Sequence, residues 1–146
     1  MCPVIVRMSY PTKANDLKFG TGNEIPVLDK LQNFFDTKLE RQGGYAVMDY
    51  VNGDKTIYVE LKTRRIRHDT YATGMVGLNK VEFCNDTNKE YYFCFCYTDG
   101  LYYIKYDKEV FDKFERNMEY YRGERADCVN KAQSIVYIPI ELLTKF

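Results

Sequence analysis

Residues 47–63 read VMDYVNGDKTIYVELKT, and this stretch decides the fold. Two runs rich in β-branched and aromatic residues flank an Asn-Gly pair at positions 52 and 53. Such a pair between two β-rich runs is the strongest short-range signal for a β-hairpin. In the second run apolar side chains alternate with polar ones, the apolar ones being Ile57, Val59 and Leu61. The stretch therefore predicts a hairpin whose second strand has one apolar and one polar face.

The polar face of the second strand carries Glu60 and Lys62, because side chains two positions apart point the same way. Asp49 shares this face in either of two hairpin registers. With a two-residue loop Asp49 faces Thr56, and Glu60 is then roughly 13 Å away, too far to share a metal ion. With a four-residue loop, residues 53–56, Asp49 faces Glu60 with Cβ atoms about 5 Å apart. The Asn-Gly pair favours the tighter loop, whereas metal chemistry requires the wider or a bulged loop, and we expect the latter.

Two carboxylates and a lysine on one hairpin face suit the hydrolysis of phosphodiester bonds. Asp49 and Glu60 supply the hard oxygen ligands that Mg²⁺ and Mn²⁺ prefer. A bound cation polarises the phosphate and lowers the pKa of a bound water. Lys62 is placed to orient that water or to offset the charge that develops on the phosphorane. The alternative interpretation is a solvated strand face with a cross-strand ion pair.

The rest of the chain predicts further helices and strands around this hairpin. Apolar residues recur at threes and fours from position 25 to position 39, which predicts a helix from an N-cap at Asn23 to the Gly43-Gly44 pair. The other expected elements are a helix within 70–85, a hairpin over 89–107 that turns at Asp99-Gly100, a helix over 107–122 and a strand over 133–140. Pro139 marks the end of that strand or an edge position.

Length and element order predict a single domain. The chain has 146 residues, of which 45% are hydrophobic, enough for one core without disulfides. The order helix, hairpin, helix, hairpin, helix, strand predicts a mixed α/β domain over residues 1–146, with a central sheet and helices packed against it. The tyrosine-rich strands are most simply core and sheet surface, and the alternative is that they stack on single-stranded nucleic acid.

Charge is balanced overall but clustered near the candidate motif. Lys and Arg total 21, as do Asp and Glu, so the net charge gives no general signature of nucleic-acid binding. The densest basic run begins inside the motif and comprises Lys62, Arg64, Arg65 and Arg67. We expect the three arginines to contact phosphates, and the alternative is a solvated strand end.

Cysteines and hydropathy bear on location. The five cysteines form no C-x-x-C pair and His68 is the only histidine, which argues against a structural zinc site. We interpret the cysteines as reduced thiols of an intracellular protein. The first residues do not have the pattern of a signal peptide, and no apolar run reaches membrane-spanning length. The expected location is the cytoplasm or a nucleus, with no membrane partner.

Residues from about 19 to 107 resemble the core of the PD-(D/E)XK nucleases. The signature of that family is an acidic residue on one strand, a variable gap and (D/E)-x-K on the next, here Asp49 followed by Glu60-Leu61-Lys62. Met48 stands where the motif's name has proline, a position at which the family often lacks proline. The resemblance implies a restriction-endonuclease-like fold, with a central mixed sheet flanked by helices.

The resemblance also implies two further site residues. The family often has a glutamate near the start of a preceding helix, and Glu24 is the match in this sequence. Glu24 is then expected to assist Asp49 and Glu60 in binding the metal. The family often has a polar residue on the helix after the motif strand, and Lys80 is the best match, expected to contact nucleic acid.

The implied function is that of a Mg²⁺- or Mn²⁺-dependent endonuclease acting on DNA rather than RNA. Similar proteins of this size often work as homodimers. Two alternatives stay open: a nuclease-like domain that binds nucleic acid or a protein partner without cutting, and an RNA endonuclease. A binder gains nothing from carboxylates that face phosphate. For the RNA enzyme, His68 is a poor candidate for the metal-binding histidine that such domains often have.

Overall fold

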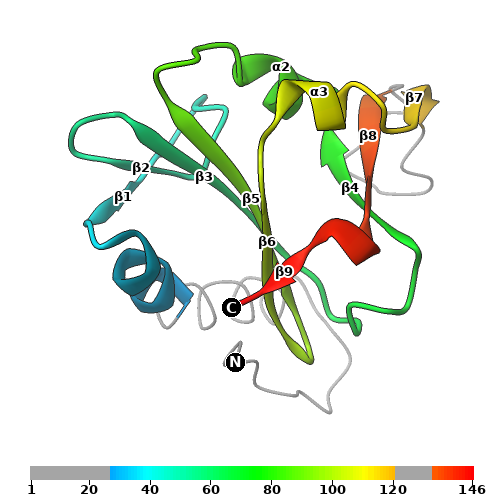
Figure 1. Ribbon diagram of the computed structural model, residues 1–146, viewed down its shortest axis with the longest axis horizontal. Helices are drawn as coiled ribbons and strands as arrows, with labels where there is room; N and C mark the ends of the chain where they lie inside the picture. The colour runs from blue at the N-terminus through cyan, green and yellow to red at the C-terminus, as the bar shows by residue number, and fades with distance from the viewer. Residues whose placement is uncertain (1–26, 121–132) are drawn as a thin grey trace.

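The computed structural model describes residues 27–120 and 133–146, which form a mixed α/β architecture with two sheets (Figure 1). The larger sheet has the order β1-β2-β3-β5-β6-β9, with bounds β1 Leu39–Arg41, β2 Tyr50–Asn52, β3 Ile57–Thr63, β5 Glu90–Tyr97, β6 Gly100–Lys105 and β9 Thr144–Lys145. The smaller sheet has the order β4-β8-β7, with bounds β4 Thr73–Gly77, β8 Gln133–Pro139 and β7 Arg116–Tyr120. The helices are α2 (Leu78–Phe83), α3 (Lys108–Phe111), a 3-10 turn (Ile140–Leu142) and an N-terminal helix described over residues 27–35.

The larger sheet is mixed because β3 and β5 run parallel, whereas its other neighbouring strands are antiparallel. A parallel pair needs a crossover connection, and β4 and α2 supply it between β3 and β5. The described part of the chain thus has the central mixed sheet and flanking helices expected from the sequence, and it is compatible with a restriction-endonuclease-like fold.

The two faces of the larger sheet bury different partners. On one face the N-terminal helix, through Val27 and Leu31, packs in one apolar cluster with Val59 of β3. On the other face α2, α3 and the smaller sheet close a second cluster around Phe93 and Phe95 of β5. Figure 1 shows the N-terminal helix and the smaller sheet at opposite sides of the molecule. The predicted apolar face of β3 therefore turns toward the N-terminal helix, and its polar face turns toward α2.

The β2–β3 hairpin has the wider of the two predicted loops. Tyr50 pairs with Val59 and Val51 with Tyr58, so residues 53–56 form the loop. The side chain of Asn52 explains this choice, because its Oδ1 accepts hydrogen bonds from the backbone N–H groups of Thr56 at 2.8 Å and Ile57 at 3.0 Å. The Asn52 side chain therefore satisfies two backbone N–H groups of the wider loop, and it does so in place of the backbone pairing of a tight Asn-Gly turn.

The helix predicted to reach Gly43 ends at Phe35, so the prediction is wrong for its second half. Asp36 takes a left-handed conformation with φ 51°, and the N–H of Thr37 donates to the carbonyl of Gln32 at 3.2 Å. This is the Schellman arrangement that ends many helices. Leu39, which fitted the helical spacing, is instead a buried residue of β1. The predicted N-cap at Asn23 lies outside the described residues.

The helix predicted within 70–85 is a strand followed by a short helix. Residues Thr73–Gly77 form β4 and pair with β8, and only Leu78–Phe83 are helical. Gly74 shows why the strand forms here, because a Cβ at this position would lie 3.0 Å from the ring of Phe95. Close approach of this backbone to β5 therefore requires glycine, and glycine is a poor helix former.

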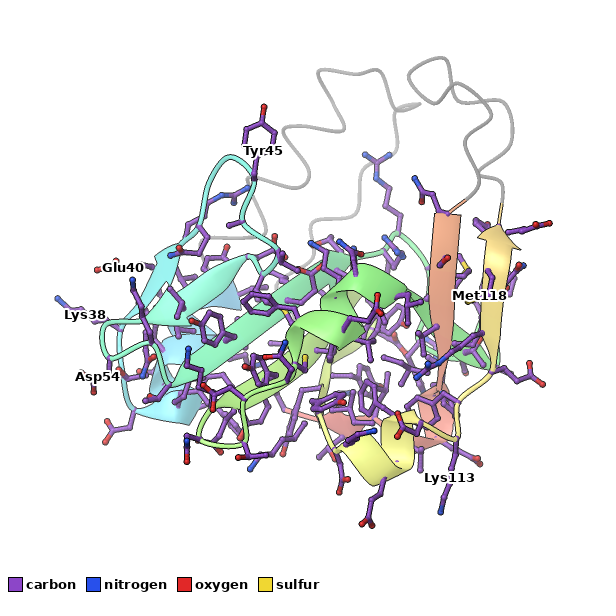
Figure 2. The ribbon with its side chains drawn as sticks, turned by 90° about the horizontal axis from the view of Figure 1, so that it is seen from above. Lys38, Glu40, Tyr45, Asp54, Lys113 and Met118 are labelled. Atoms are coloured by element: carbon purple, nitrogen blue, oxygen red, sulfur yellow. The ribbon has the colours of Figure 1, made fainter. Side chains whose placement is uncertain are left out.

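The helix predicted over 107–122 is also wrong for most of its length. Only Lys108–Phe111 are helical, and Arg116–Tyr120 form the edge strand β7. Met118, an apolar residue of this stretch, is 57% exposed. Figure 2 shows Met118 on β7 at the opposite side of the molecule from Asp54 in the β2–β3 loop. The second hairpin and the strand predicted over 133–140 are confirmed as β5–β6 and β8, and Pro139 is the last residue of β8.

The cysteines of the described residues do not all match the expectation of reduced thiols. Cys84 and Cys94 are free and buried, and burial raises the pKa of the Cys84 thiol to about 12. Cys96 is disulfide-bonded, so the expectation is wrong at that position. Among the described helices, none has the length and apolar character needed to cross a membrane.

Candidate active site

Glu60 lies in the middle of β3, between β2 and the parallel strand β5, where it is paired in register with Phe93. Its side chain is only 2% exposed, which makes it the one charged residue that is buried within residues 27–120 and 133–146. The Oε1 atom of Glu60 has no hydrogen-bond partner. A buried carboxylate oxygen without a donor is costly and needs a physical reason.

Asp49 lies directly before β2, at the position opposite Glu60 in the hairpin register. Its backbone carbonyl accepts from the N–H of Gln42 at 2.7 Å, and its Oδ2 accepts from the N–H of Leu61 at 2.8 Å. The second contact holds the Asp49 carboxylate against the backbone of β3 next to Glu60. The wider loop is what brings the two carboxylates together, because the tighter register would have placed Asp49 opposite Thr56.

Two lysines reach Glu60 from different elements. Lys62, two positions along β3, places its Nζ 3.1 Å from Glu60 Oε2. Lys80 of α2 places its Nζ 3.6 Å from Glu60 Oε1, which is within ion-pair distance but too long for a hydrogen bond. The Lys80 ammonium also donates to the backbone carbonyl of Val47. Lys80 therefore connects α2 both to the candidate catalytic carboxylate and to the segment that precedes Asp49.

Burial dominates the electrostatics of Glu60. Desolvation raises the pKa of the Glu60 carboxyl above its ordinary value, and the negative charge of Asp49 acts in the same direction. The ammonium groups of Lys62 and Lys80 lower this pKa but do not cancel the effect of burial. Charged Glu60 is thus held in an environment that does not fully compensate its charge.

Asp49 and Glu60 fit a divalent metal ion. They offer hard carboxylate oxygens from adjacent strands, the ligand type that Mg²⁺ and Mn²⁺ take. The Glu60 Oε1 atom has no donor within hydrogen-bond distance, so a cation would supply the partner that the folded chain lacks. Glu24, the third expected ligand, lies outside the described residues.

The predicted arginine run is divided by the fold. Arg64 follows β3 directly and its backbone N–H donates to the carbonyl of Cys96 at 2.9 Å. Arg65 is exposed. Arg67 is 63% exposed, but its guanidinium lies 3.2 Å from Asp69 and 3.5 Å from Asp99. Only Arg64 of the three lines a hollow that reaches the candidate active site.

Three connected hollows adjoin the site on the side of the smaller sheet. The catalytic hollow, about 530 Å³, is lined by Lys62, Gly77, Leu78, Asn79, Lys80, Glu82, Gln133 and Ser134. The bridging hollow, about 280 Å³, is lined by Lys62, Arg64, Met75, Val76, Gly77, Tyr120 and Ile135. The tyrosine hollow, about 440 Å³, is lined by Arg64, Ile66, Tyr71, Thr73, Gly74, Met75, Tyr97, Tyr120 and Tyr137. Sequence reasoning missed these tyrosines as a group, because they come together only through the pairing of β4, β8 and β7 that the helix predictions obscured.

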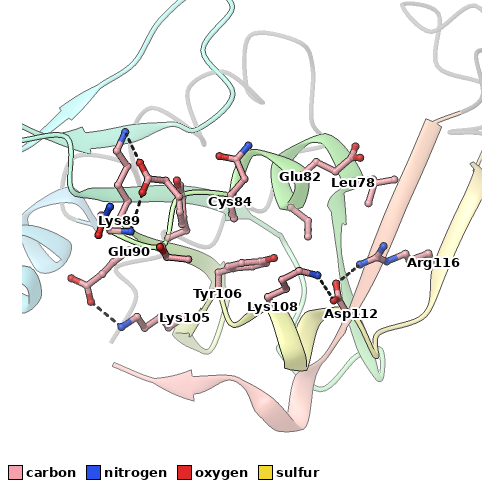
Figure 3. A pocket seen from close by; sticks show the side chains of 16 residues that line it. Leu78, Glu82, Cys84, Lys89, Glu90, Lys105, Tyr106, Lys108, Asp112 and Arg116 are labelled. Atoms are coloured by element: carbon pink, nitrogen blue, oxygen red, sulfur yellow. Dashed lines mark hydrogen bonds and ion pairs between the residues drawn. The ribbon is translucent and has the colours of Figure 1, made fainter.

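A larger hollow of about 680 Å³ also borders α2 (Figure 3). We call it the salt-bridged pocket, because its cations face carboxylates. Lys105 lies 3.0 Å from Glu90, Lys108 lies 2.6 Å from Asp112 and Arg116 lies 3.8 Å from Asp112. Neutralised cations make this pocket a weak candidate for an anionic substrate, despite its size.

A second group of possible metal ligands comprises His68, Asp69 and Asp99, whose ligand atoms lie within 4.8 Å of one another. His68 Nδ1 pairs with Asp99, and Arg67 pairs with both aspartates. Asp99 lies six residues beyond Phe93, the partner of Glu60, and hence roughly 20 Å from Glu60 along the sheet. The group is therefore distinct from the candidate active site, and its carboxylates already have cationic partners.

Fold and site together define a nuclease-like α/β protein with an acidic residue and an E-x-K triplet on adjacent strands. A family model described as phage putative PDDEXK endonuclease matches residues 6–146. The match covers nearly the whole chain, so the chain belongs to this family and through it to the PD-(D/E)XK nucleases. No curated protein matches the chain.

Proposed function

We propose that this protein is an endonuclease that hydrolyses phosphodiester bonds in DNA and depends on Mg²⁺ or Mn²⁺. Family membership supports a nuclease and a nucleic-acid substrate. The observation that carries the more specific proposal is the buried Glu60 carboxylate, with one oxygen that lacks a donor, opposite Asp49. A solvated strand face, the plainer interpretation, does not account for a carboxylate that is 2% exposed.

Each residue has a distinct role in this proposal. Asp49 and Glu60 would hold the metal, with help from Glu24. When bound, the metal lowers the pKa of a bound water and stabilises charge on the phosphate. Lys62, whose side chain is 22% exposed and whose ammonium lies beside Glu60, orients the attacking water or the phosphate. Lys80 lines the same catalytic hollow and contacts the phosphate next to the one that is cut.

The proposed substrate contacts follow the charges around the catalytic hollow. Arg64 lines the adjoining bridging hollow with Lys62 and would bind the DNA backbone, and Arg65 and Arg67 would add contacts from the exposed segment beyond β3. We further propose that residues 1–146 form a single domain that acts as a homodimer inside the cell, in the cytoplasm or a nucleus. Each subunit has one active-site hairpin, so the two subunits would together cut each strand of a duplex-containing substrate once.

The decisive experiment is a cleavage assay on linear, branched and single-stranded DNA and RNA with Mg²⁺ or Mn²⁺, beside EDTA controls. We expect metal-dependent cleavage of DNA that is lost in Glu60→Gln. A matched control is Glu90→Gln in the salt-bridged pocket, which should cut as the wild type does. Equal cleavage by wild type and Glu60→Gln would contradict the assignment, and cleavage of RNA alone would contradict the substrate.

A further inference from the structure

Three neighbouring hollows that share lining residues lie between the candidate active site and the smaller sheet. The catalytic and bridging hollows share Lys62 and Gly77. The bridging and tyrosine hollows share Arg64, Met75 and Tyr120. A strand that places a phosphate at Lys62 can therefore pass along the bridging hollow and place a nearby nucleotide in the tyrosine hollow.

The lining of the tyrosine hollow selects for an aromatic, anionic ligand. It presents Tyr71, Tyr97, Tyr120 and Tyr137 together with Arg64. In the part of the chain that the structure describes, no carboxylate lines this hollow or the bridging hollow. Aromatic side chains and arginine are the groups on which nucleobases stack. The salt-bridged pocket, by contrast, has acidic residues beside its cations.

The hollow has a rigid floor and an open rim. Tyr97 is 3% exposed and its ring lies nearly parallel to that of Phe95, with an interplanar angle of 9°. Gly74 leaves the floor open, because a Cβ there would lie 3.2 Å from the Tyr97 hydroxyl. At the rim, the Tyr71 side chain is 66% exposed. Tyr71 is thus a large aromatic ring that core packing does not use.

We propose that the tyrosine hollow binds an unpaired base of the DNA strand that is cut, so that the substrate has single-stranded nucleotides next to the scissile phosphate. This inference rests on the proposed function and names its substrate class. A base inside a duplex has both faces covered by its neighbours, so only an unpaired or extruded base offers a face to a tyrosine. Stacking of this kind tolerates any sequence, because every base has a π-face.

The first test is equilibrium binding in Ca²⁺, which supports binding without requiring cleavage. A labelled single-stranded oligodeoxynucleotide and the fully paired duplex of the same sequence are compared by fluorescence anisotropy. Tyr71→Ala should weaken binding of the single strand by about tenfold, the scale of losing one stacked base. Tyr71→Phe, which keeps the ring, should bind as the wild type does. Neither substitution should change the affinity for the duplex.

The second test moves one abasic site along the single strand. At one position the wild type should lose about tenfold in affinity, and Tyr71→Ala should lose nothing further there. Equal losses on single strand and duplex, or losses that add at every abasic position, would overturn the tyrosine hollow as a base-binding site. Because Tyr71 is largely exposed, its replacement leaves the core intact.

Cleavage assays separate this inference from the proposed function. Cleavage of fully paired DNA at a rate that Tyr71→Ala does not change would overturn the base-binding hollow and leave the nuclease assignment standing. Binding of single strands that depends on Tyr71, without cleavage of any substrate, would support the hollow and contradict the nuclease. Preferential cleavage beside unpaired nucleotides, lost with Tyr71→Ala, would support both.

Discussion

The catalytic hollow and the salt-bridged pocket both border α2, and Leu78 and Glu82 line both. The salt-bridged pocket is the larger, yet its cations are paired with carboxylates that are about half exposed, and such pairs contribute little. The catalytic hollow adjoins a carboxylate that is almost fully buried and incompletely paired. The difference teaches that an uncompensated buried charge identifies a functional site better than the volume of a cavity does.

The largest expected effect is on catalysis. Glu60→Gln keeps the shape of the side chain but removes the charge that holds the metal. Single-turnover cleavage should fall on the order of a thousandfold, since several kcal/mol of charge stabilisation in the transition state are lost. Glu90→Gln in the salt-bridged pocket should change the rate less than about twofold, because surface pairs contribute little. If both substitutions slowed cleavage equally, the two regions would not differ as we infer.

Lys62 and Lys105, which pair with Glu60 and Glu90, provide the next comparison. Lys62→Ala should lower the cleavage rate by a factor on the order of a hundred, because Lys62 acts on charge that develops in the transition state. Affinity for substrate in Ca²⁺ should fall much less, since one phosphate contact among several contributes little to ground-state binding. The matched control is Lys105→Ala, beside Glu90, which should alter neither quantity. A Lys62→Ala protein that cuts at the wild-type rate would contradict the proposed mechanism.

Metal affinity should depend on pH through Glu60. Because burial raises the pKa of Glu60, protons compete with the metal at a higher pH than for an exposed glutamate. Isothermal titration with Mn²⁺ should show binding that weakens by about tenfold per pH unit once the pH falls below that pKa. Asp49→Ala combined with Glu60→Ala should abolish the binding. If the double variant bound Mn²⁺ undiminished, the ligands would lie elsewhere, with the His68 group as the first alternative.

Stability should respond in opposite directions in the two regions. The folded protein holds the proton on Glu60 more tightly than the unfolded chain does, so charged Glu60 lowers the free energy of unfolding as pH rises. Without metal, Glu60→Gln should therefore stabilise the protein by about 1 kcal/mol at neutral pH. This gain should disappear as the pH falls through the raised pKa of Glu60. Denaturant unfolding in EDTA over a pH series measures it.

Glu90→Gln is the control for the stability experiment. The hydrogen bond from Lys105 lowers the pKa of Glu90, so its charged form stabilises the fold above its ordinary pKa and this contribution is lost as pH falls. Glu90 is about half exposed, and the expected loss in Glu90→Gln is therefore small. A stabilising Glu90→Gln, or a destabilising Glu60→Gln at neutral pH, would remove the distinction between the two regions.

The smallest expected effect separates two arginines by their surroundings. Arg64→Gln should reduce the slope of log affinity against log salt concentration by about one unit, as for the loss of one phosphate contact. Arg67→Gln should reduce it less, because the Arg67 side chain is 63% exposed and lines none of the three hollows beside the candidate active site. A slope that stays unchanged when Arg64, Arg65 and Arg67 are all replaced would mean that the run is solvated surface.

The hairpin site was predictable from sequence because its information is local. Alternation along β3 placed Glu60 and Lys62 on one face, and the chemistry of a shared metal selected the register that the structure has. The deep burial of Glu60 was not predictable, since it depends on α2 and the smaller sheet packing over β3. The tyrosine hollow was not predicted, for a related reason. Helical spacing of apolar residues in 70–85 and 107–122 concealed the strands β4 and β7, and their pairing with β8 is not a local feature of the sequence.

The parallel pairing of β3 with β5 has a consequence for the order in which the protein folds. Asp49 and Glu60 are joined by a hairpin with a loop at residues 53–56, a contact that closes quickly. Pairing of β3 with β5 must wait for the much longer connection through β4 and α2. We therefore expect the chain to bring its two carboxylates together while they are still hydrated, and to bury Glu60 only when α2 docks. A divalent cation present during synthesis would therefore meet Asp49 and Glu60 before the Glu60 carboxylate is buried. The cation would then be enclosed with these two residues as the protein folds.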